Sequence, residues 1–436
     1  MGDSPRQDVS SSLRVDFFPL ALLILITLTP RSRSQSTIAQ LAQARAPWVF
    51  AVSGDSRNCG DLVMPAIAKD AKQHNPLFYW HLGDFRWMSK RDEDMRSNYL
   101  REPLEGDYYT TAWSNFLNMQ IVPFRPIPVY LGIGNHELRG GKNRKDYLDV
   151  FKAYLPVQGL HAPLVGNKYK SVDYHWSEAG VDFIYLDNAS TKKFDAEQVK
   201  WFEGVLGQDE KDAQVKTLVV AMHAALPGSL AVNHSMDQHR ADGKARALTL
   251  YKDLVTARNE YHKNIYVLGS HTHYYADEVF NTVYWQTNGG PNGILPGWIV
   301  GTAGARHSQL PQGVSSQPGH RVANVYGYLL ATVDADSRIS FEFHEIGEAD
   351  IRAVAGARLQ RFAGAVLCGT KRQTQVTLSE VVWRPIDLEY PWAADCSGRY
   401  ARSPIRCNNA WNRGSGCRAS NTGSTFTATT PTARSA

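Results

Sequence analysis

The stretch Gly269-Ser270-His271-Thr272-His273 directly follows the apolar run Ile265-Tyr266-Val267-Leu268. β-Branched and aromatic residues favour a strand, and the glycine marks the point where that strand would end. The pattern therefore predicts a loop at the carboxyl end of a strand that presents two imidazoles. Imidazole is a common metal ligand, but a His-x-His pair is also a frequent surface accident. Other ligands must come from elsewhere in the chain.

Five further apolar runs end in the same way, in a polar or glycine-rich turn. These runs are residues 49–53, 77–82, 128–133, 183–186 and 218–222, followed by Gly54-Asp55, Gly83-Asp84, Gly134-Asn135-His136-Glu137, Asp187-Asn188 and His223. Helical patterns with one apolar face lie between the runs, at residues 195–206 and 244–258. Strands that alternate with helices indicate an α/β protein. In such sheets ligands bind beyond the carboxyl ends of the strands, so we expect the polar endings to meet.

The side chains at these endings are of types that bind metal ions: Asp55, Asp84, Asn135, His136, His223, His271 and His273. Carboxylate, amide oxygen and imidazole together suit divalent transition-metal ions, which accept both oxygen and nitrogen ligands. One carboxylate can bridge two ions. Such a pair of ions holds a phosphate oxygen and lowers the pKa of a bound water.

In this order the motifs resemble the calcineurin-like metallophosphoesterase family, and in particular its purple acid phosphatase-like branch. The resemblance covers residues 48–346. It implies an α/β fold of four layers, α-β-β-α, in which two mixed β-sheets are flanked by helices. It also implies a hydrolase that cleaves phosphomonoesters or phosphodiesters with a metal-bound hydroxide. Two divalent or mixed-valence ions of Mn, Fe, Zn or Co would form the site.

The resemblance also assigns a role to each residue. Asp55, Asp84 and His273 would hold the first ion, and Asp84 would bridge to a second. Asn135, His223 and His271 would complete the second site. His136 would be a catalytic group that faces the phosphate, either as an electrophile or as the proton donor to the leaving alkoxide, because a neutral or protonated imidazole can supply a proton near neutral pH. Asp187 is expected either to support a ligand histidine by a hydrogen bond or to act directly.

Two departures from the family pattern weaken the expected first site. Most members carry Asp-x-His in the first motif, whereas this chain has Asp55-Ser56-Arg57, and an arginine cannot lose its proton to become a ligand. Purple acid phosphatases compensate with a tyrosine three residues after the bridging aspartate, and here that residue is Trp87. We therefore expect a poor first site and assign Arg57 a catalytic role in binding a phosphate oxygen.

Two alternatives follow from this weakened site. The chain could hold only the second ion and act as a mononuclear phosphoesterase. It could also be an inactive metal-binding module.

The remaining sequence predicts how the chain is divided. Residues 1–44 contain the apolar run FFPLALLILITLT and are expected to be a signal peptide or a signal anchor, which implies a secreted, periplasmic or membrane-tethered protein. A metallophosphoesterase domain is predicted for residues 45–350, a cysteine-containing extension for 351–418, and a disordered Ser/Thr-rich tail for 419–436. Four of the five cysteines lie in the extension, where we expect two disulfides, with Cys59 left unpaired.

The composition narrows the choice of partners. The formal net charge is only +5 and the basic residues are scattered, so no clear nucleic-acid surface is predicted. We expect no stable membrane span, and we expect a small-molecule phosphoester as the substrate. The ester class and the oligomeric state are left open.

Overall fold

The computed structural model describes residues 46–89, 92, 94, 105–190, 194–238 and 241–355. By their contacts, residues 1–375 form one compact unit and residues 376–436 a second, so every described residue belongs to the first unit. The predicted signal segment, the Ser/Thr-rich tail and the predicted extension beyond residue 355 lie outside the described residues. Among the residues that are described, no helix has both the length and the apolar character needed to cross a membrane.

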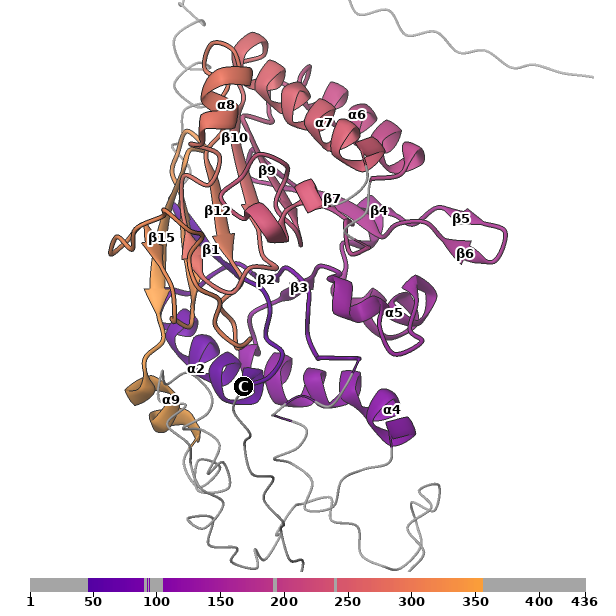
Figure 1. Cartoon of the computed structure of the whole chain (residues 1–436), viewed down its shortest axis with the longest axis vertical. Coiled ribbons are helices and arrows are strands. Elements are labelled where there is room, and N and C mark those ends of the chain that lie inside the picture. The colour runs from indigo at the N-terminus through magenta and orange to yellow at the C-terminus, as the bar shows by residue number, and fades with distance from the viewer. Residues whose placement is uncertain are drawn as a thin grey trace, which may run out of the picture. The chain divides into compact units, whose positions relative to one another are not determined.

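Two large mixed sheets form the centre of the described domain (Figure 1). Within the described residues, the first has five strands in the order β15-β14-β1-β2-β3, and the second has eight in the order β13-β11-β12-β10-β9-β8-β7-β4. The first sheet contains β1 (Trp48–Ser53), β2 (Tyr79–His81), β3 (Val129–Leu131), β14 (Gly327–Val333) and β15 (Ile339–Glu345). The second contains β4 (Leu160–His161), β7 (Asp173–Glu178), β8 (Val181–Leu186), β9 (Thr217–Met222), β10 (Asn264–Gly269), β11 (Tyr275–Ala276), β12 (Gly297–Val300) and β13 (Arg321–Val322). A separate hairpin pairs β5 (Leu164–Val165) with β6 (Lys168–Tyr169).

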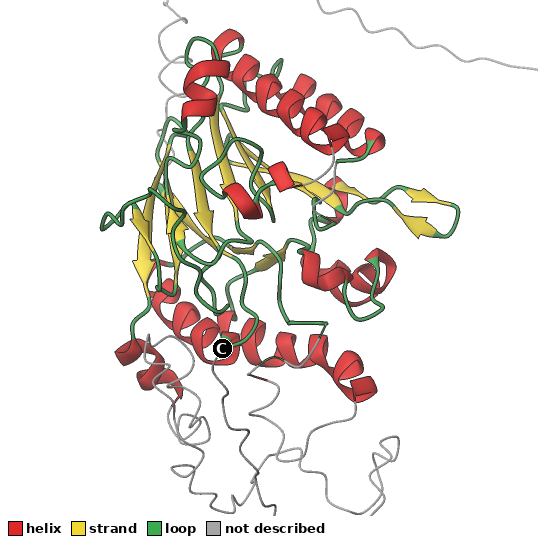
Figure 2. Ribbon diagram, viewed as in Figure 1, coloured by secondary structure: helices red, strands yellow, loops and turns green. Residues whose placement is uncertain are grey.

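Helices cover the outer faces of both sheets (Figure 2). The helices are α2 (Gly60–Ala71), α4 (Glu105–Phe116), α5 (Arg144–Phe151), α6 (Ala196–Asp209), α7 (Ala241–Glu260), α8 (Val283–Asn288) and α9 (Glu348–Ala355). Short helical turns are η1 (Lys72–His74), η2 (Leu117–Ile121), η3 (Val122–Phe124), η4 (Asn135–Leu138), η5 (Lys152–Tyr154), η6 (Val157–Gly159), η7 (Val232–His234) and η8 (Met236–Gln238). Helix α2 packs on β14 and α9, while α7 packs on β10 and α6. This arrangement confirms the predicted four-layer α-β-β-α fold.

The strands predicted from the apolar runs are β1, β2, β3, β8, β9 and β10. In the first sheet β1, β2 and β3 are parallel, and in the second β8, β9 and β10 are parallel. Parallel strands end at the same edge of a sheet, so the polar residues that follow them lie together. The helical patterns correspond to α6 and α7, and the Asp195 side chain caps α6 by accepting from the Gln198 amide at 2.9 Å. Strands β14 and β15 pair antiparallel and form a hairpin at the edge of the first sheet.

Strand β8 is apolar on both faces because each face packs against a different layer. Phe183 and Tyr185 belong to the core between the two sheets, whereas Ile184 and Leu186 belong to the core under α6 and α7. Successive side chains of a strand point to opposite faces, so a strand buried on both faces needs a continuous apolar run. This is why the apolar runs of the sequence predict the central strands so directly.

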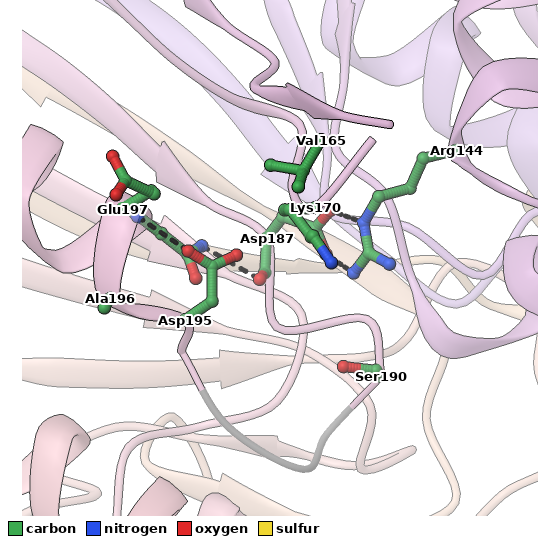
Figure 3. A pocket seen from close by; sticks show the side chains of 9 residues that line it. Arg144, Val165, Lys170, Asp187, Ser190, Asp195, Ala196 and Glu197 are labelled. Atoms are coloured by element: carbon green, nitrogen blue, oxygen red, sulfur yellow. Dashed lines mark hydrogen bonds and ion pairs between the residues drawn. The ribbon is translucent and has the colours of Figure 1, made fainter. Parts of the chain in front are cut away.

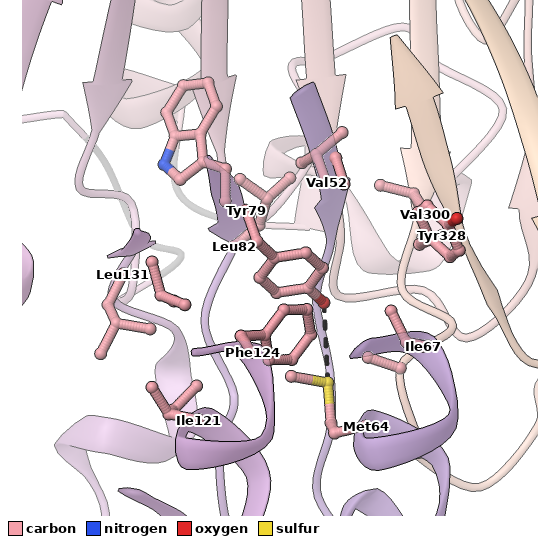
Figure 4. Packing of buried hydrophobic residues seen from close by; sticks show 14 of the residues in the cluster. Val52, Met64, Ile67, Tyr79, Leu82, Ile121, Phe124, Leu131, Val300 and Tyr328 are labelled. Carbon is pink, nitrogen blue, oxygen red and sulfur yellow. Dashed lines mark hydrogen bonds between the residues drawn. The ribbon is translucent and has the colours of Figure 1, made fainter. Parts of the chain in front are cut away.

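Aromatic side chains lock the sheets together and hold α2 in place. Phe50 of β1 meets Phe183 of β8 edge to face with ring centroids 5.1 Å apart, and the Trp80 indole donates to the Tyr174 hydroxyl at 2.8 Å. On the other face of β2, the Tyr79 hydroxyl lies 3.6 Å from the sulfur of Met64 in α2 (Figure 4). The strand ends are therefore anchored from both faces before any ligand is bound.

One cysteine prediction is wrong. Cys59, which immediately precedes α2, is disulfide-bonded rather than unpaired. Its partner lies outside the described residues, where all the other cysteines are found.

Candidate metal and catalytic site

All the predicted site residues gather beyond the carboxyl ends of the parallel strands. Asp55 and Arg57 follow β1, Asp84 follows β2, and Asn135 and His136 follow β3. His223 follows β9, while His271 and His273 follow β10. Hydrogen bonds and close charge contacts connect these residues into one network. The structure thus brings the set together, while the roles of its members as ligands and catalysts stay predictions.

Three of the ligand candidates have an unusual backbone. Asp55, Asp84 and His271 lie in the left-handed region, with φ values of 59°, 63° and 65°. Asp and His enter this region more readily than most residues with a side chain, but each still costs about 1 kcal/mol. The neighbouring loops also approach very closely: a Cβ on Gly134 would lie 2.4 Å from Asp84 Oδ1. The loops therefore fit together only with glycine at that position.

A group of four side chains meets the requirements of a metal site. Around His223 Nε2 lie His271 Nδ1 at 3.0 Å, Asn135 Oδ1 at 3.1 Å and Asp84 Oδ1 at 3.4 Å. Atoms that share an ion at about 2.0–2.2 Å lie roughly 3–3.5 Å apart when the geometry is tetrahedral. In the residues Asp84, Asn135, His223 and His271, which we call the second-ion group, three ligand atoms thus lie at distances from His223 Nε2 that suit a shared ion.

Hydrogen bonding and charge also prepare the second-ion group. His223 Nδ1 donates to the Leu82 carbonyl oxygen at 3.0 Å, which turns Nε2 toward the other ligands. Burial alone would lower the pKa of His223, but the charges of Asp84 and Asp55 raise it to about 9. Burial, together with neighbouring His223, lowers the pKa of His271 to about 3. Without a metal ion, the positive charge of His223 balances the negative charges of the aspartates. Metal binding must therefore displace a proton from His223.

The predicted first-ion residues are arranged differently. His273 Nε2 lies 3.3 Å from Asp55 Oδ1. The other carboxylate oxygen of Asp55 accepts from the Ser270 hydroxyl and from the His271 amide, the latter at 2.6 Å. The guanidinium of Arg57 lies among these groups, with Nη2 2.9 Å from His273 Nε2 and Nε 3.4 Å from Asp84 Oδ2. These residues do not fit a metal ion as they stand, because a permanent cation contacts two of the prospective ligands.

Trp87 lies beside both Arg57 and His136. The Arg57 guanidinium carbon is 5.1 Å from the centre of the Trp87 ring, and the His136 ring packs edge-on at 5.8 Å. The His136 amide donates to Asp84 Oδ1 at 2.8 Å. Burial lowers the pKa of His136 to about 4, against the opposing charge of Asp84, so the ring is neutral at neutral pH. His136 is thus a neutral imidazole at the mouth of the second-ion group.

Glu137 is a buried residue whose importance the sequence analysis missed. Its carboxylate accepts from the amides of Asp84 and Gly134 at 2.8 Å each and of Phe85 at 2.9 Å. Burial, followed by the charge of Asp84, raises the pKa of Glu137 to about 7. Its position after Asn135-His136 was visible in the sequence, but no pattern indicated which backbone groups it would bind.

Asp187 does not contact a ligand histidine. Instead it pairs with Arg144, whose Nε lies 2.6 Å and whose Nη2 lies 3.0 Å from its two oxygens. The pair lines a pocket of about 380 Å³ together with Lys170, Asp195, Glu197 and others (Figure 3). The adjacent Asn188 exchanges hydrogen bonds with both the amide and the carbonyl of Ala224, next to His223. The loop after β8 therefore supports the site through backbone contacts.

A second group of ligand-type side chains lies elsewhere in the domain. Asp70 of α2, His74 of η1 and His344 of β15 have ligand atoms within 4.8 Å of one another. Asp70 Oδ2 accepts from the Tyr328 hydroxyl at 2.8 Å and lies 3.1 Å from His344 Nδ1. Since Asp70 already contacts Tyr328 and His344, we regard the three residues as a hydrogen-bonded cluster. They could still bind an ion, so an experiment that counts bound ions must control for this cluster.

The chain was compared with known protein families, curated proteins and solved structures. The sequence profile of the calcineurin-like phosphoesterase family matches residues 57–275. No curated protein matches the sequence. Among solved structures, the chain is similar to a purple acid phosphatase from yellow lupin (Lupinus luteus) seeds, with 16% identity and a TM-score of 0.44. That match covers 71% of this chain and 55% of the lupin chain, so this chain spans little more than half of its length.

Two further structures have comparable similarity. PhoD matches with 13% identity and a TM-score of 0.42, over 69% of this chain and 72% of that one. A dimetal phosphatase from Danio rerio matches with 10% identity and a TM-score of 0.41, over 68% of this chain and 98% of that one. The family profile extends over half of the 436 residues and includes the loops after β2, β3, β9 and β10. The chain belongs to the calcineurin-like phosphoesterase family.

Proposed function

We propose that this protein hydrolyses phosphomonoesters or phosphodiesters in a metal-dependent reaction at the second-ion group. The observation that carries the proposal is the convergence of Asp84 Oδ1, Asn135 Oδ1 and His271 Nδ1 within 3.4 Å of His223 Nε2. A transition-metal ion such as Mn, Fe, Zn or Co, when bound there, would polarise a phosphoryl oxygen and lower the pKa of a water molecule. The substrate is proposed to be a small molecule.

The residues around the second-ion group supply the rest of the chemistry. His136, neutral and next to Asn135, would act as the electrophile, donating a hydrogen bond from its ring N–H to an oxygen of the phosphoryl group or of the departing alkoxide. The planar guanidinium of Arg57 suits the oxygens of a phosphoryl group. Trp87 packs against both side chains and limits the access of water to them. These roles for His136 and Arg57 are those predicted from the sequence.

The number of ions distinguishes the two enzymatic proposals. Two ions are the prediction drawn from the family resemblance, and one ion is its alternative. The contact of Arg57 with His273 and Asp84 favours the alternative, because both residues would otherwise face the first ion. An inactive metal-binding module is the remaining, non-enzymatic candidate.

Hydrolysis of p-nitrophenyl phosphate and bis(p-nitrophenyl) phosphate by the full chain tests the proposal. We expect turnover to stop in excess chelator and to return, to unequal extents, with Mn²⁺, Fe²⁺, Zn²⁺ or Co²⁺. The variant His223→Ala should weaken metal binding by roughly 100-fold or more, because loss of a partner outside the ligand set already costs 10–100-fold. His175→Ala is the matched control, since the imidazole of His175 on β7 pairs with Asp182 of β8 instead. Turnover that persists in chelator would refute the metal dependence, and no turnover with any metal would favour the inactive module.

Export is a separate proposal. It depends on the apolar run at residues 17–29, which lies outside the described residues, and predicts a secreted, periplasmic or membrane-tethered protein.

A further inference from the structure

The hydrogen bond between Arg57 and His273 defines the state of the His273 ring. His273 Nδ1 lies 2.6 Å from the Arg306 carbonyl oxygen, which can only accept, so Nδ1 carries the proton. Arg57 Nη2 lies 2.9 Å from Nε2, and a guanidinium can only donate. The lone pair of Nε2 is therefore the acceptor of the arginine's hydrogen bond. This is the lone pair that a first metal ion would need.

Asp84 is divided between the two sides of the site. Its Oδ1 faces His223 in the second-ion group, whereas its Oδ2 faces Arg57 Nε at 3.4 Å. Oδ2 has no hydrogen-bond partner of its own and is fully buried, and the Arg57 guanidinium is the permanent cation beside it. In a two-ion site this oxygen would face the first ion. The arginine thus contacts the Asp84 oxygen that the second-ion group does not use.

Burial and packing fix the Arg57 side chain in this position. Only 8% of the residue is exposed, and Trp87 packs against the guanidinium at 5.1 Å. A guanidinium over an indole face gains a cation–π attraction that grows as water is excluded. Because the arginine remains charged at every relevant pH, it also repels a second cation placed beside it.

We propose that this protein binds a single catalytic metal ion, in the second-ion group, and that the Arg57 guanidinium permanently takes the place of the first ion. The inference rests on the proposed phosphoesterase function for its catalytic meaning, but its metal content is a separate property. Arg57 then supplies the positive charge that faces the phosphoryl oxygens, and His273 and Trp87 are the residues that position it. The two departures from the family pattern, Arg57 in place of the histidine and Trp87 in place of the tyrosine, then have one explanation: both serve to replace the first ion by a guanidinium.

The first test counts ions in the full chain. The protein is stripped with chelator, reloaded with excess Mn²⁺, desalted and measured by elemental analysis and electron paramagnetic resonance. A pair of ions about 3.5–4 Å apart would give an exchange-coupled spectrum, whereas one ion in the site would give an isolated-ion spectrum. We expect the isolated spectrum from the wild type. A coupled spectrum from the wild type would overturn the proposal without any variant.

The second test restores the missing imidazole. Arg57→His should remove the guanidinium and add a ligand, so the ion count should rise from about one to about two per chain and the coupled spectrum should appear. Arg306→His is the matched control: its guanidinium lies 5.5 Å from the same Trp87 ring, but its contact with His273 is through the backbone carbonyl, which the variant keeps. This control should stay at about one ion. A folded Arg57→His protein that still binds one ion would contradict the proposal.

Two further measurements separate the possible explanations. His344→Ala removes a member of the Asp70, His74 and His344 cluster, so a second, uncoupled ion bound there is recognised by its loss in this variant. Hydrolysis is measured on the same samples. A one-ion protein that cleaves no phosphoester refutes the proposed function but not the role of Arg57. A two-ion protein with a coupled spectrum that cleaves phosphoesters refutes the role of Arg57 but not the function.

Discussion

Among single residues, Glu137 has the greatest influence on how the ligand loops are joined. Its carboxylate binds the amides of Asp84 and Phe85 after β2 and of Gly134 after β3. All of these groups are buried, so no water replaces a lost acceptor. Glu137 touches no predicted substrate position and is therefore a positioning residue, which holds Asp84 and Asn135 at their mutual distance.

Replacing this carboxylate should destabilise the domain strongly. Glu137→Ala leaves three buried amides without an acceptor, and each unsatisfied donor costs about 1–3 kcal/mol, so the free energy of unfolding should fall by about 3 kcal/mol or more. Urea unfolding measures the change. Glu260→Ala, at the exposed end of α7, is the control and should stay within about 0.5 kcal/mol of the wild type. Equal stabilities of the two variants would contradict this account of Glu137.

At the scale of elements, helix α5 is attached to the second sheet by its first residue. Arg144 pairs with Asp187 after β8, and Asp187 also accepts from the amides of Val172 and Ala189. The Asn143 side chain caps the same helix by accepting from the Lys145 amide at 2.8 Å. The start of α5 is therefore fixed by both its own cap and the sheet that it contacts.

Breaking this attachment should cost more than breaking the adjacent surface pair. Arg144→Ala leaves the buried Asp187 carboxylate without its cation, and such losses cost about 3–5 kcal/mol. Lys145→Ala on the same helix removes an exposed ion pair with Asp149, whose loss should leave the free energy of unfolding nearly unchanged because water and salt screen the pair. Urea unfolding of both variants, with hydrogen exchange of α5, makes the comparison. Similar losses from the two substitutions would show that the Arg144 pair does not anchor the helix.

These elements also show what the sequence could predict. The apolar runs predicted β1, β2, β3 and β8 to β10 correctly, because strands buried on both faces need uninterrupted apolar residues. Since parallel strands end together, the same runs predicted the meeting of their polar endings. The position of His223, alone at the end of an apolar strand, could be interpreted only because the other endings form a series.

The contacts that were not predicted are those that no local sequence pattern indicates. Glu137 and Arg144 reach their partners through the folded geometry of loops and of a helix, which periodicity does not encode. The direction of the Arg57 side chain could not be derived either: its residue type excluded a ligand role, but only the structure brings it against His273. Cys59 was expected to be unpaired because the other four cysteines, all in the extension, could form two disulfides among themselves.

At the scale of the whole molecule, buried carboxyl groups tie stability to pH. Asp209 ends α6, and burial followed by the charge of Asp182 on β8 raises its pKa to about 8. Lys263 opposes the rise but does not cancel it. A carboxyl group whose pKa is raised on folding binds its proton more tightly in the folded state, so its stabilisation is complete below the unfolded pKa and disappears as the pH rises through about 8.

The domain should therefore lose stability as the pH rises from about 4 to about 8. We expect the free energy of unfolding to decrease over this range and to level off above about pH 8, and Asp209→Asn to make that decrease smaller, because the amide cannot ionise. Urea unfolding across this range measures both slopes. Asp336→Asn, in the exposed turn between β14 and β15, should keep the wild-type slope. An unchanged slope in Asp209→Asn would mean that its carboxyl group does not contribute.

The left-handed backbone of Asp55, Asp84 and His271 has a consequence for protein engineering. Glycine adopts this conformation without steric strain, whereas the aspartates and the histidine do not. Side chains nevertheless occupy these three positions, where the backbone alone would favour glycine. A designer who wants only a rigid α/β scaffold would gain backbone stability by abandoning these ligands, whereas one who wants a catalyst must build stability elsewhere and leave these loops strained.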